Sequence, residues 1–285
     1  MLNSPGCISC IVKQAYSLSK LVGIKEEETQ KEIIFSTMEM LLKNKNLESA
    51  PHFSIMMLNL MKRYVNIDEH FELLKYKNGK LAEGYLSYLK IIMDEAEDKL
   101  EMAIRISIMG NTIDLAANPN FDLESDVNKL TSESYNLSAL RLFKEQLNSA
   151  KTILFIADNY EEAIFDRFLL EQLNDKELVF ATRGNKVYND ITYEDAINLG
   201  YNKICKVINS GSIIAGTALE QCTTEFINYY NNSDIVISKG QGNYETLLKE
   251  ERPIYFMFKV KCETIAEISK QKIYTNVMLF NKQPN

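Results

Sequence analysis

The second half of the chain alternates short β-rich runs with helical stretches, and this pattern constrains the fold more than any other feature. The runs are continuously apolar, as in strands that are buried on both faces of a sheet. Strands that alternate with helices at this spacing predict a doubly wound, mostly parallel sheet with helices on both faces. The predicted strands are TILFIA (152–157), ELVFATR (177–183), ICKVINS (204–210), DIVISK (234–239) and PIYFMFKV (253–260), and the predicted helices are 161–173, 192–198, 216–229 and 243–250.

The first half of the chain follows a different pattern, in which apolar residues recur at the i, i+3, i+4 spacing of helices. Residues 118–128 contain turn residues and are expected to form a loop. We therefore predict an α/β protein in which an all-helical domain, residues 1–148, packs on an α/β/α domain, residues 149–285. The predicted helices of the first half are 8–22, 28–43, 53–64, 68–76, 81–95, 97–116 and 134–149.

Composition and charge exclude several classes of partner. The chain has 285 residues and a formal net charge of −7, which argues against nucleic acid because phosphate backbones need clustered Lys and Arg. It has no run of about 18 apolar residues that could span a membrane. The N-terminal sequence lacks the pattern of a signal peptide, and five cysteines suit a reducing compartment. We expect a cytoplasmic protein with no membrane partner, and the oligomeric state stays open.

Polar side chains follow each predicted strand, and the carboxyl ends of parallel strands share one edge of a sheet. Ligands of open α/β sheets bind at this edge. The residues there are Asp158 and Asn159 after the first strand, Arg183 and Asp190 after the second, 210–212 after the third, Lys239 to Asn243 after the fourth, and Lys259 and Lys261 near the end of the fifth.

The chemistry of these residues indicates phosphoryl transfer. Carboxylate and amide oxygens suit Mg²⁺ or Mn²⁺, and Lys and Arg beside Gly-rich turns suit a phosphate. An Asp or Asn before a helix is also a common N-cap, so the prediction depends on the convergence at one edge. The chain has only two histidines, His52 and His70, which disfavours His-based catalysis or a His-rich zinc site.

Familiar nucleotide and phosphatase motifs are absent. No GxGxxG follows a predicted strand, and SGSIIAG (210–216) lacks the required spacing. No GxxxxGK[ST] loop occurs. The first strand is followed by DNYEE, which differs from the DxDx[TV] motif of haloacid-dehalogenase-type phosphatases.

Four segments in this order resemble the metal-dependent damage-control phosphatases, which are related to the proteins called acidic-residue methyltransferases. The segments are ADNYEEAIFD, TRGNKVYNDITYEDA, SKGQGNYE and KVKC, and CISC (7–10) and MGNTIDLA (109–116) extend the resemblance into the helical half. The resemblance implies a helical N-terminal domain packed on a Rossmann-like domain. It also implies a divalent metal, Mn²⁺ or Mg²⁺ with Co²⁺ or Ni²⁺ as further candidates, and hydrolysis of small phosphorylated metabolites, including sugar phosphates.

The resemblance also assigns roles to individual residues. It implies that Asp158, Asn159 and Asp190 bind the metal and that Asp158, Asp190 and Lys239 are catalytic. Lys239 and Lys261 would face the substrate phosphate, and Asn111 and Asp114 would close the pocket from the helical side. The implied substrate-binding residues are Asn111, Asp114, Arg183, Gly240, Gln241, Gly242, Asn243 and Lys261.

Some residues of these segments depart from the family pattern or have a structural interpretation. Tyr160 and Lys186 replace small or neutral residues of the family and are expected to alter the pocket. Glu161 and Glu162 are interpreted mainly as acidic residues in the first turn of a helix, although the family often has Glu at the position of Glu162. Asp166 is expected to pair with a neighbour. Cys7 and Cys10 are interpreted as packing thiols.

Several functional alternatives remain. A metal-bound water or an Asp carboxylate could attack phosphorus, and Asp158 is the candidate nucleophile in the covalent version. A methyltransferase with a Rossmann-like cofactor site is a second interpretation, although the Gly-rich turn after the first strand is missing. A non-catalytic metal- or metabolite-binding protein is a third.

Overall fold

The computed structural model describes residues 4–46, 49–111, 123–130 and 135–282. The helical first half is confirmed, with three differences. The last predicted helix, 134–149, begins only at Leu140. Predicted helices 68–76 and 81–95 are one continuous helix, and a short helix lies within the segment expected to be a loop. The helices of this half are α1 (Pro5–Leu21), α2 (Glu27–Lys43), α3 (His52–Met61), α4 (Ile67–Glu95), α5 (Lys99–Gly110), α6 (Leu123–Lys129) and α7 (Leu140–Leu147).

A six-stranded sheet forms the centre of the second half, with strand order β3-β2-β1-β4-β5-β6. The five predicted strands are all present and parallel, and the sixth strand, which the sequence analysis missed, runs antiparallel at the β5 edge. A short helix, Glu263–Ser269, separates it from β5, and neither this helix nor the sixth strand was predicted from the sequence. The strands are β1 (Thr152–Ile156), β2 (Glu177–Thr182), β3 (Lys206–Asn209), β4 (Ile235–Lys239), β5 (Tyr255–Lys259) and β6 (Asn276–Phe280).

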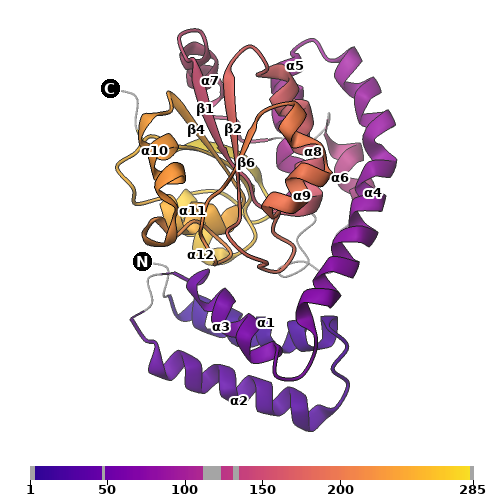
Figure 1. Cartoon of the computed structure of the whole chain (residues 1–285), viewed down its shortest axis with the longest axis vertical. Coiled ribbons are helices and arrows are strands. Elements are labelled where there is room, and N and C mark those ends of the chain that lie inside the picture. The colour runs from indigo at the N-terminus through magenta and orange to yellow at the C-terminus, as the bar shows by residue number, and fades with distance from the viewer. Residues whose placement is uncertain (1–3, 47–48, 112–122, 131–134, 283–285) are drawn as a thin grey trace.

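Helices cover both faces of this sheet, because successive residues of a buried strand point to opposite faces. Ile153 and Phe155 of β1 belong to the core on one face, whereas Leu154 and Ile156 belong to the core on the other. The helices of this half are α8 (Tyr160–Gln172), α9 (Tyr193–Asn198), α10 (Thr224–Asn232), α11 (Gln241–Leu247) and α12 (Glu263–Ser269) (Figure 1).

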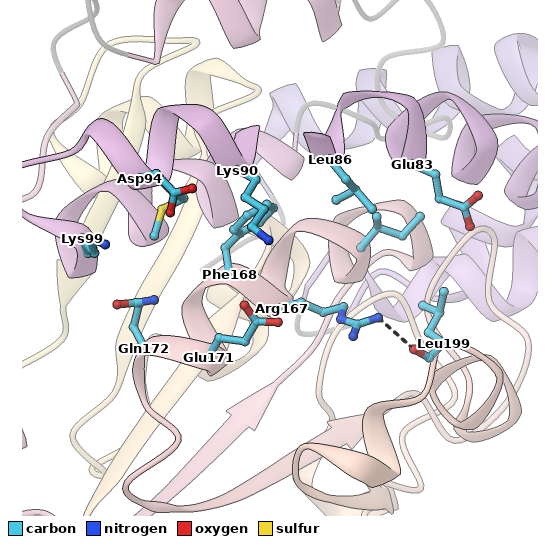
Figure 2. A pocket seen from close by; sticks show the side chains of 12 residues that line it. Glu83, Leu86, Lys90, Asp94, Lys99, Arg167, Phe168, Glu171, Gln172 and Leu199 are labelled. Atoms are coloured by element: carbon cyan, nitrogen blue, oxygen red, sulfur yellow. Dashed lines mark hydrogen bonds between the residues drawn. The ribbon is translucent and has the colours of Figure 1, made fainter. Parts of the chain in front are cut away.

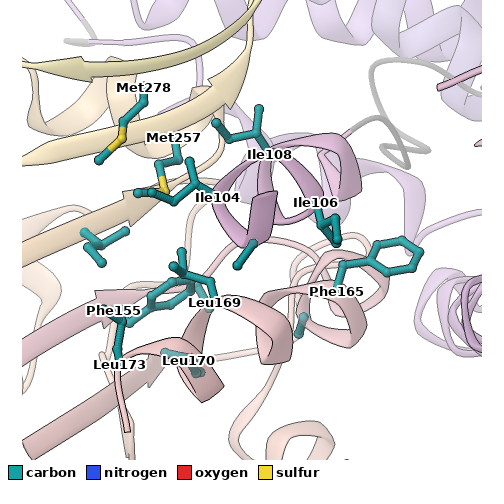
Figure 3. Close-up of a cluster of buried hydrophobic side chains, with 14 of the residues drawn as sticks. Ile104, Ile106, Ile108, Phe155, Phe165, Leu169, Leu170, Leu173, Met257 and Met278 are labelled. Atoms are coloured by element: carbon teal, nitrogen blue, oxygen red, sulfur yellow. The ribbon is translucent and has the colours of Figure 1, made fainter. Parts of the chain in front are cut away.

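The core on the α8 face joins the two halves of the chain. Figure 3 shows Ile104 and Ile108 of α5 in one cluster with Leu169 of α8 and Met257 of β5. At Gly110 the two helices come so close that an added Cβ atom would lie 3.2 Å from the Cα atom of Glu162. Helix α5 therefore packs directly against the sheet half, and the domain boundary at residue 148 stays a prediction.

Helices α1 to α3 form a separate cluster at one end of the molecule, and α4 runs from them along the side of the sheet half (Figure 1). The loop after β2 reaches this cluster through Val187 and Tyr188, which are both buried in it. The Ser54 hydroxyl of α3 accepts a hydrogen bond from the backbone of Ala215 at 2.9 Å. These contacts place the loops at the carboxyl ends of β2 and β3 against the N-terminal helices. No helix within the described ranges is long and apolar enough to cross a membrane.

Candidate active site

Backbone contacts join the end of β1 to the loop after β2. Asn159 and Asp190 form an isolated antiparallel bridge, and the Ile191 amide donates a hydrogen bond to the Asp158 carbonyl at 2.9 Å. The Tyr160 amide, at the start of α8, donates to the Asn189 carbonyl at 2.8 Å. The structure therefore brings together Asp158, Asn159 and Asp190, the three residues expected to bind a metal.

Arg183 links the two aspartates of this group. Its Nε lies 2.5 Å from Asp190 Oδ2, and its Nη2 lies 3.4 Å from Asp158 Oδ1. Its Nη1 donates to the Gly216 carbonyl and lies 3.4 Å from Asn243 Oδ1. We call Asp158, Arg183 and Asp190 the outer triplet. Arg183 therefore joins the two aspartates, and its expected contact with substrate stays a prediction.

The second carboxylate oxygen of Asp158 is also held in place. Asn111 Nδ2 and Asn159 Nδ2 each lie 3.3 Å from Asp158 Oδ2. Gly240, at the end of β4, has φ 80°, and an added Cβ atom would lie 1.9 Å from the same oxygen. Only glycine fits at position 240, because any side chain there would displace the Asp158 carboxylate.

The electrostatic surroundings of Asp158 have an excess of negative charge. Burial raises the pKa of Asp158 well above its usual range, and the nearby carboxylates of Asp190 and Glu162 raise it further. The positive charges of Arg183 and Lys261 lower this pKa without offsetting those effects. Lys261 is thus close enough to Asp158 to lower its pKa, and the expected contact of Lys261 with the substrate phosphate stays a prediction.

A second cluster of two carboxylates and one cation is completely buried and is joined to Asp158 through Asn111. Lys239 Nζ lies 2.5 Å from Glu162 Oε1 and 2.6 Å from Asp166 Oδ1, and it donates to the Ser107 carbonyl at 3.1 Å. We call Glu162, Lys239 and Asp166 the inner triplet. Lys239 is completely buried, and these contacts use all three of its N–H donors. The structure therefore does not support the expected contact between Lys239 and a substrate phosphate.

The residues that follow β4 contact three other parts of the chain: the end of β1, the segment after β5 and the loop after β3. Asn243 is completely buried, and its side chain donates to the carbonyls of Ala157 at 3.1 Å and Lys239 at 2.7 Å. It thus joins the ends of β1 and β4. Gln241 Oε1 accepts a hydrogen bond from the Lys261 backbone amide at 2.8 Å. An added Cβ atom on Gly242 would lie 2.1 Å from the Ala215 carbonyl oxygen, so the backbones pack closely there.

Two residues expected to alter the pocket have other contacts. The Tyr160 ring packs into a notch at Gly79 of α4, where an added Cβ atom would lie 2.8 Å from the ring. Lys186 Nζ pairs with Glu72 Oε1, also on α4, at 3.2 Å. The sequence indicated these substitutions but could not indicate that α4 receives both side chains.

Glu161 and Glu162 are completely buried, which the interpretation as helix-start charges did not anticipate. Glu161 Oε2 accepts a hydrogen bond from Asn189 Nδ2 at 2.9 Å, and Glu162 belongs to the inner triplet. The expectation that Asp166 pairs with a neighbour is confirmed. The i, i+4 spacing of Glu162 and Asp166 was a partial signal for the inner triplet, but nothing local in the sequence linked these acids to Lys239, which follows Asp166 by 73 residues. Asp114 lies outside the described residues.

A cavity of about 500 Å³ lies away from both triplets, between α4 and α8 (Figure 2). Leu86 and Phe168 contribute apolar surface, and Lys90 and Glu171 contribute charge. None of the residues predicted for the site lines this cavity. We therefore place the candidate active site at the outer triplet, where the carboxyl ends of the parallel strands meet.

Cys7 and Cys10 form no disulfide, and all five cysteines are free. The Cys7 thiol lies 3.9 Å from the Thr264 hydroxyl. Among the described residues, no three His, Cys, Asp or Glu side chains are grouped as a metal site. The expected ligand set, Asp158, Asn159 and Asp190, is not a group of that kind, because one of its three members is an asparagine.

Comparison with known proteins defines the class of this chain. The damage-control phosphatase ARMT1-like domain matches residues 4–277, and the chain belongs to this family. It is 32% identical to an uncharacterized protein of Methanocaldococcus jannaschii over 96% of this chain and 94% of the relative. It is 29% identical to a damage-control phosphatase of Pyrococcus horikoshii over 97% of each chain.

A solved structure agrees with the fold described here. The crystal structure of a DUF89 family protein from Pyrococcus horikoshii superposes with a TM-score of 0.84 at 29% identity, and the match covers 98% of this chain and 99% of that chain. The α/β architecture predicted from the sequence is therefore confirmed.

Proposed function

We propose that this protein is a metal-dependent phosphatase that hydrolyses small phosphorylated metabolites such as sugar phosphates. Membership in the damage-control phosphatase family supports the reaction class. The observation that carries the proposal is the meeting of Asp158, Asn159 and Asp190 at the carboxyl edge of the sheet, through the bridge between residues 159 and 190.

The residues present fit a hard divalent cation. Asp158 and Asp190 are 8% and 3% exposed, and with Arg183 they form a group of net charge −1 when both are ionised. The pKa of Asp158 is raised by burial and by neighbouring carboxylates despite Arg183, so additional positive charge would stabilise the site. Asp158, Asn159 and Asp190 would hold Mn²⁺ or Mg²⁺, which prefer oxygen ligands.

When bound, such a metal supplies positive charge that offsets the charge of a phosphoryl group. The protein's own residues hold Asp158 in one orientation: Arg183 contacts Oδ1, whereas Asn111 and Asn159 contact Oδ2. We place Asp158 in contact with the phosphoryl group and Lys261 beside it, because both act at the same edge. Fixed groups of this kind need little reorganisation during the reaction.

The test is a release assay with the purified protein. It uses a panel of sugar and nucleotide phosphates and measures free phosphate with Mg²⁺, Mn²⁺, Co²⁺ or Ni²⁺ in turn. We expect metal-dependent release that a chelator abolishes and that returns when the metal is restored. Absence of release from every substrate with every metal would overturn the proposal, and release that survives chelation would overturn its metal dependence.

A further inference from the structure

A continuous set of contacts connects the inner triplet to Asp158. Asn111, the C-cap residue that follows α5, is completely buried. Its Nδ2 lies 3.0 Å from Glu162 Oε2 and 3.3 Å from Asp158 Oδ2, and its Oδ1 accepts a hydrogen bond from the Lys259 amide at 3.1 Å. Both N–H donors of the Asn111 amide and its oxygen are thus engaged, which fixes the orientation of the group.

Glu162 accepts a hydrogen bond from this amide. Its two carboxylate oxygens serve different partners, since Oε1 contacts Lys239 and Oε2 contacts Asn111. Lys239 in turn is held by Asp166 and by the Ser107 carbonyl of α5. The close approach of α5 and α8 at Gly110 brings Asn111 and Glu162 within reach of each other.

We propose that Glu162 is a positioning residue for the reaction: held by Lys239, it orients Asn111 and through Asn111 the carboxylate of Asp158. This inference rests on the proposed function, because it assigns Glu162 a role at the same site. It also replaces the expected phosphate contact of Lys239 with a contact to Glu162. Groups that orient a reacting residue contribute strongly to rate, since misplacement by about 1 Å can cost about 100-fold.

The two acids of the inner triplet provide a matched pair of variants. A glutamine at position 162 has one acceptor oxygen where glutamate has two, so Glu162→Gln removes the acceptor of either Lys239 or Asn111. Asp166 Oδ1 accepts from both Ser107 and Lys239, whereas its Oδ2 has no hydrogen-bond partner. Asp166→Asn therefore removes the same charge from the same helix but can keep both contacts.

The first measurement is steady-state hydrolysis of p-nitrophenyl phosphate with Mn²⁺. We expect Glu162→Gln to lower kcat by about 10- to 100-fold with little change in KM, and Asp166→Asn to keep kcat within about threefold of the wild type. Melting temperatures are expected to fall for both variants. Equal losses of kcat in the two variants would show a charge or stability effect and would overturn the proposal.

The second measurement does not depend on turnover. Crystal structures of the two variants would show the Asp158 carboxylate displaced in Glu162→Gln and unchanged in Asp166→Asn. Free Mn²⁺, followed by electron paramagnetic resonance, should bind about 10-fold more weakly to Glu162→Gln only. If the wild type releases no phosphate, the proposed function fails, while an unmoved Asp158 in Glu162→Gln is the result that overturns the positioning role.

Discussion

The outer and inner triplets have the same composition, two carboxylates around one cation, but they differ in their surroundings. In the outer triplet Asp158 is 8% exposed, and the positive charge of Lys261 lowers its pKa. In the inner triplet all three side chains are completely buried between α5, α8 and β4. The outer triplet therefore keeps slight solvent exposure at the edge of the sheet, whereas the inner triplet has none.

The cations of the two triplets also differ in the groups that they contact. Arg183 spreads its contacts over Asp158, Asp190 and the Gly216 carbonyl, and so connects the loops that follow three strands. Lys239 directs its ammonium group away from the edge, toward α5 and α8. Burial alone lowers the pKa of Lys239, but Asp166 and Glu162 raise it above its usual value. A buried lysine of this kind remains charged and serves as a structural partner.

The largest expected effect tests the outer triplet. Asp158→Asn should lower phosphatase activity by more than about 1,000-fold, because it removes charge and an acceptor at the reacting centre, while the melting temperature stays close to that of the wild type. Activity with each metal and thermal unfolding are measured on the same preparations. A fully active variant would refute the assignment of Asp158, and an unfolded variant would place Asp158 among the structural residues.

The contrast between the triplets also explains what could be predicted from the sequence. Apolar runs and the acids that follow them are local features, so the parallel strands and the group of Asp158, Asn159 and Asp190 could be anticipated. The direction of the Lys239 side chain depends on α5, which lies about 130 residues earlier and approaches α8 only because residue 110 is glycine. Contacts of this range leave little trace in one sequence.

A second prediction breaks the inner triplet. Lys239→Met leaves Glu162 and Asp166 buried without a cation, and we expect the free energy of unfolding to fall by about 3–5 kcal/mol. Denaturant titration at neutral pH measures this loss. The triple variant Lys239→Met, Glu162→Gln, Asp166→Asn removes the uncompensated charges and should recover part of it. If the free energy of unfolding of Lys239→Met lies within about 1 kcal/mol of the wild-type value, the buried ion pairs do not stabilise the fold as expected.

A third prediction concerns Gly240, which lies between the triplets. Its φ of 80° and ψ of 154° belong to a region that other residues rarely adopt, and an added Cβ atom would meet the Asp158 carboxylate. Gly240→Ala should cost about 1–3 kcal/mol of stability and lower kcat by about 10-fold or more. Gly84→Ala is the matched control, because an added Cβ atom on this α4 glycine meets nothing within 4 Å. Equal kcat values for the two variants would show that Asp158 tolerates the displacement.

The last prediction concerns Glu161, a completely buried acid that belongs to neither triplet. Burial raises its pKa from its usual value of 4.5 to about 8, and the hydrogen bond from Asn189 offsets this only in part. Between these two values the folded protein holds a proton that the unfolded chain has released. The free energy of unfolding should therefore fall as the pH rises from about 4.5 to about 8, by at most about 1.4 kcal/mol per pH unit.

Glu161→Gln removes the ionisable group and should flatten this dependence, so that the variant gains stability over the wild type as the pH rises through the same window. Denaturant titrations at half-unit pH intervals measure the difference. Asn189→Ala deletes the hydrogen bond that lowers the pKa of Glu161. In this variant the pKa of Glu161 should rise further, and the fall in stability should continue to higher pH. If the free energies of unfolding of Glu161→Gln and the wild type differ by a constant amount from pH 4.5 to about 8, Glu161 is ionised in the folded protein. Its carboxylate would then need a cationic partner, as in the two triplets.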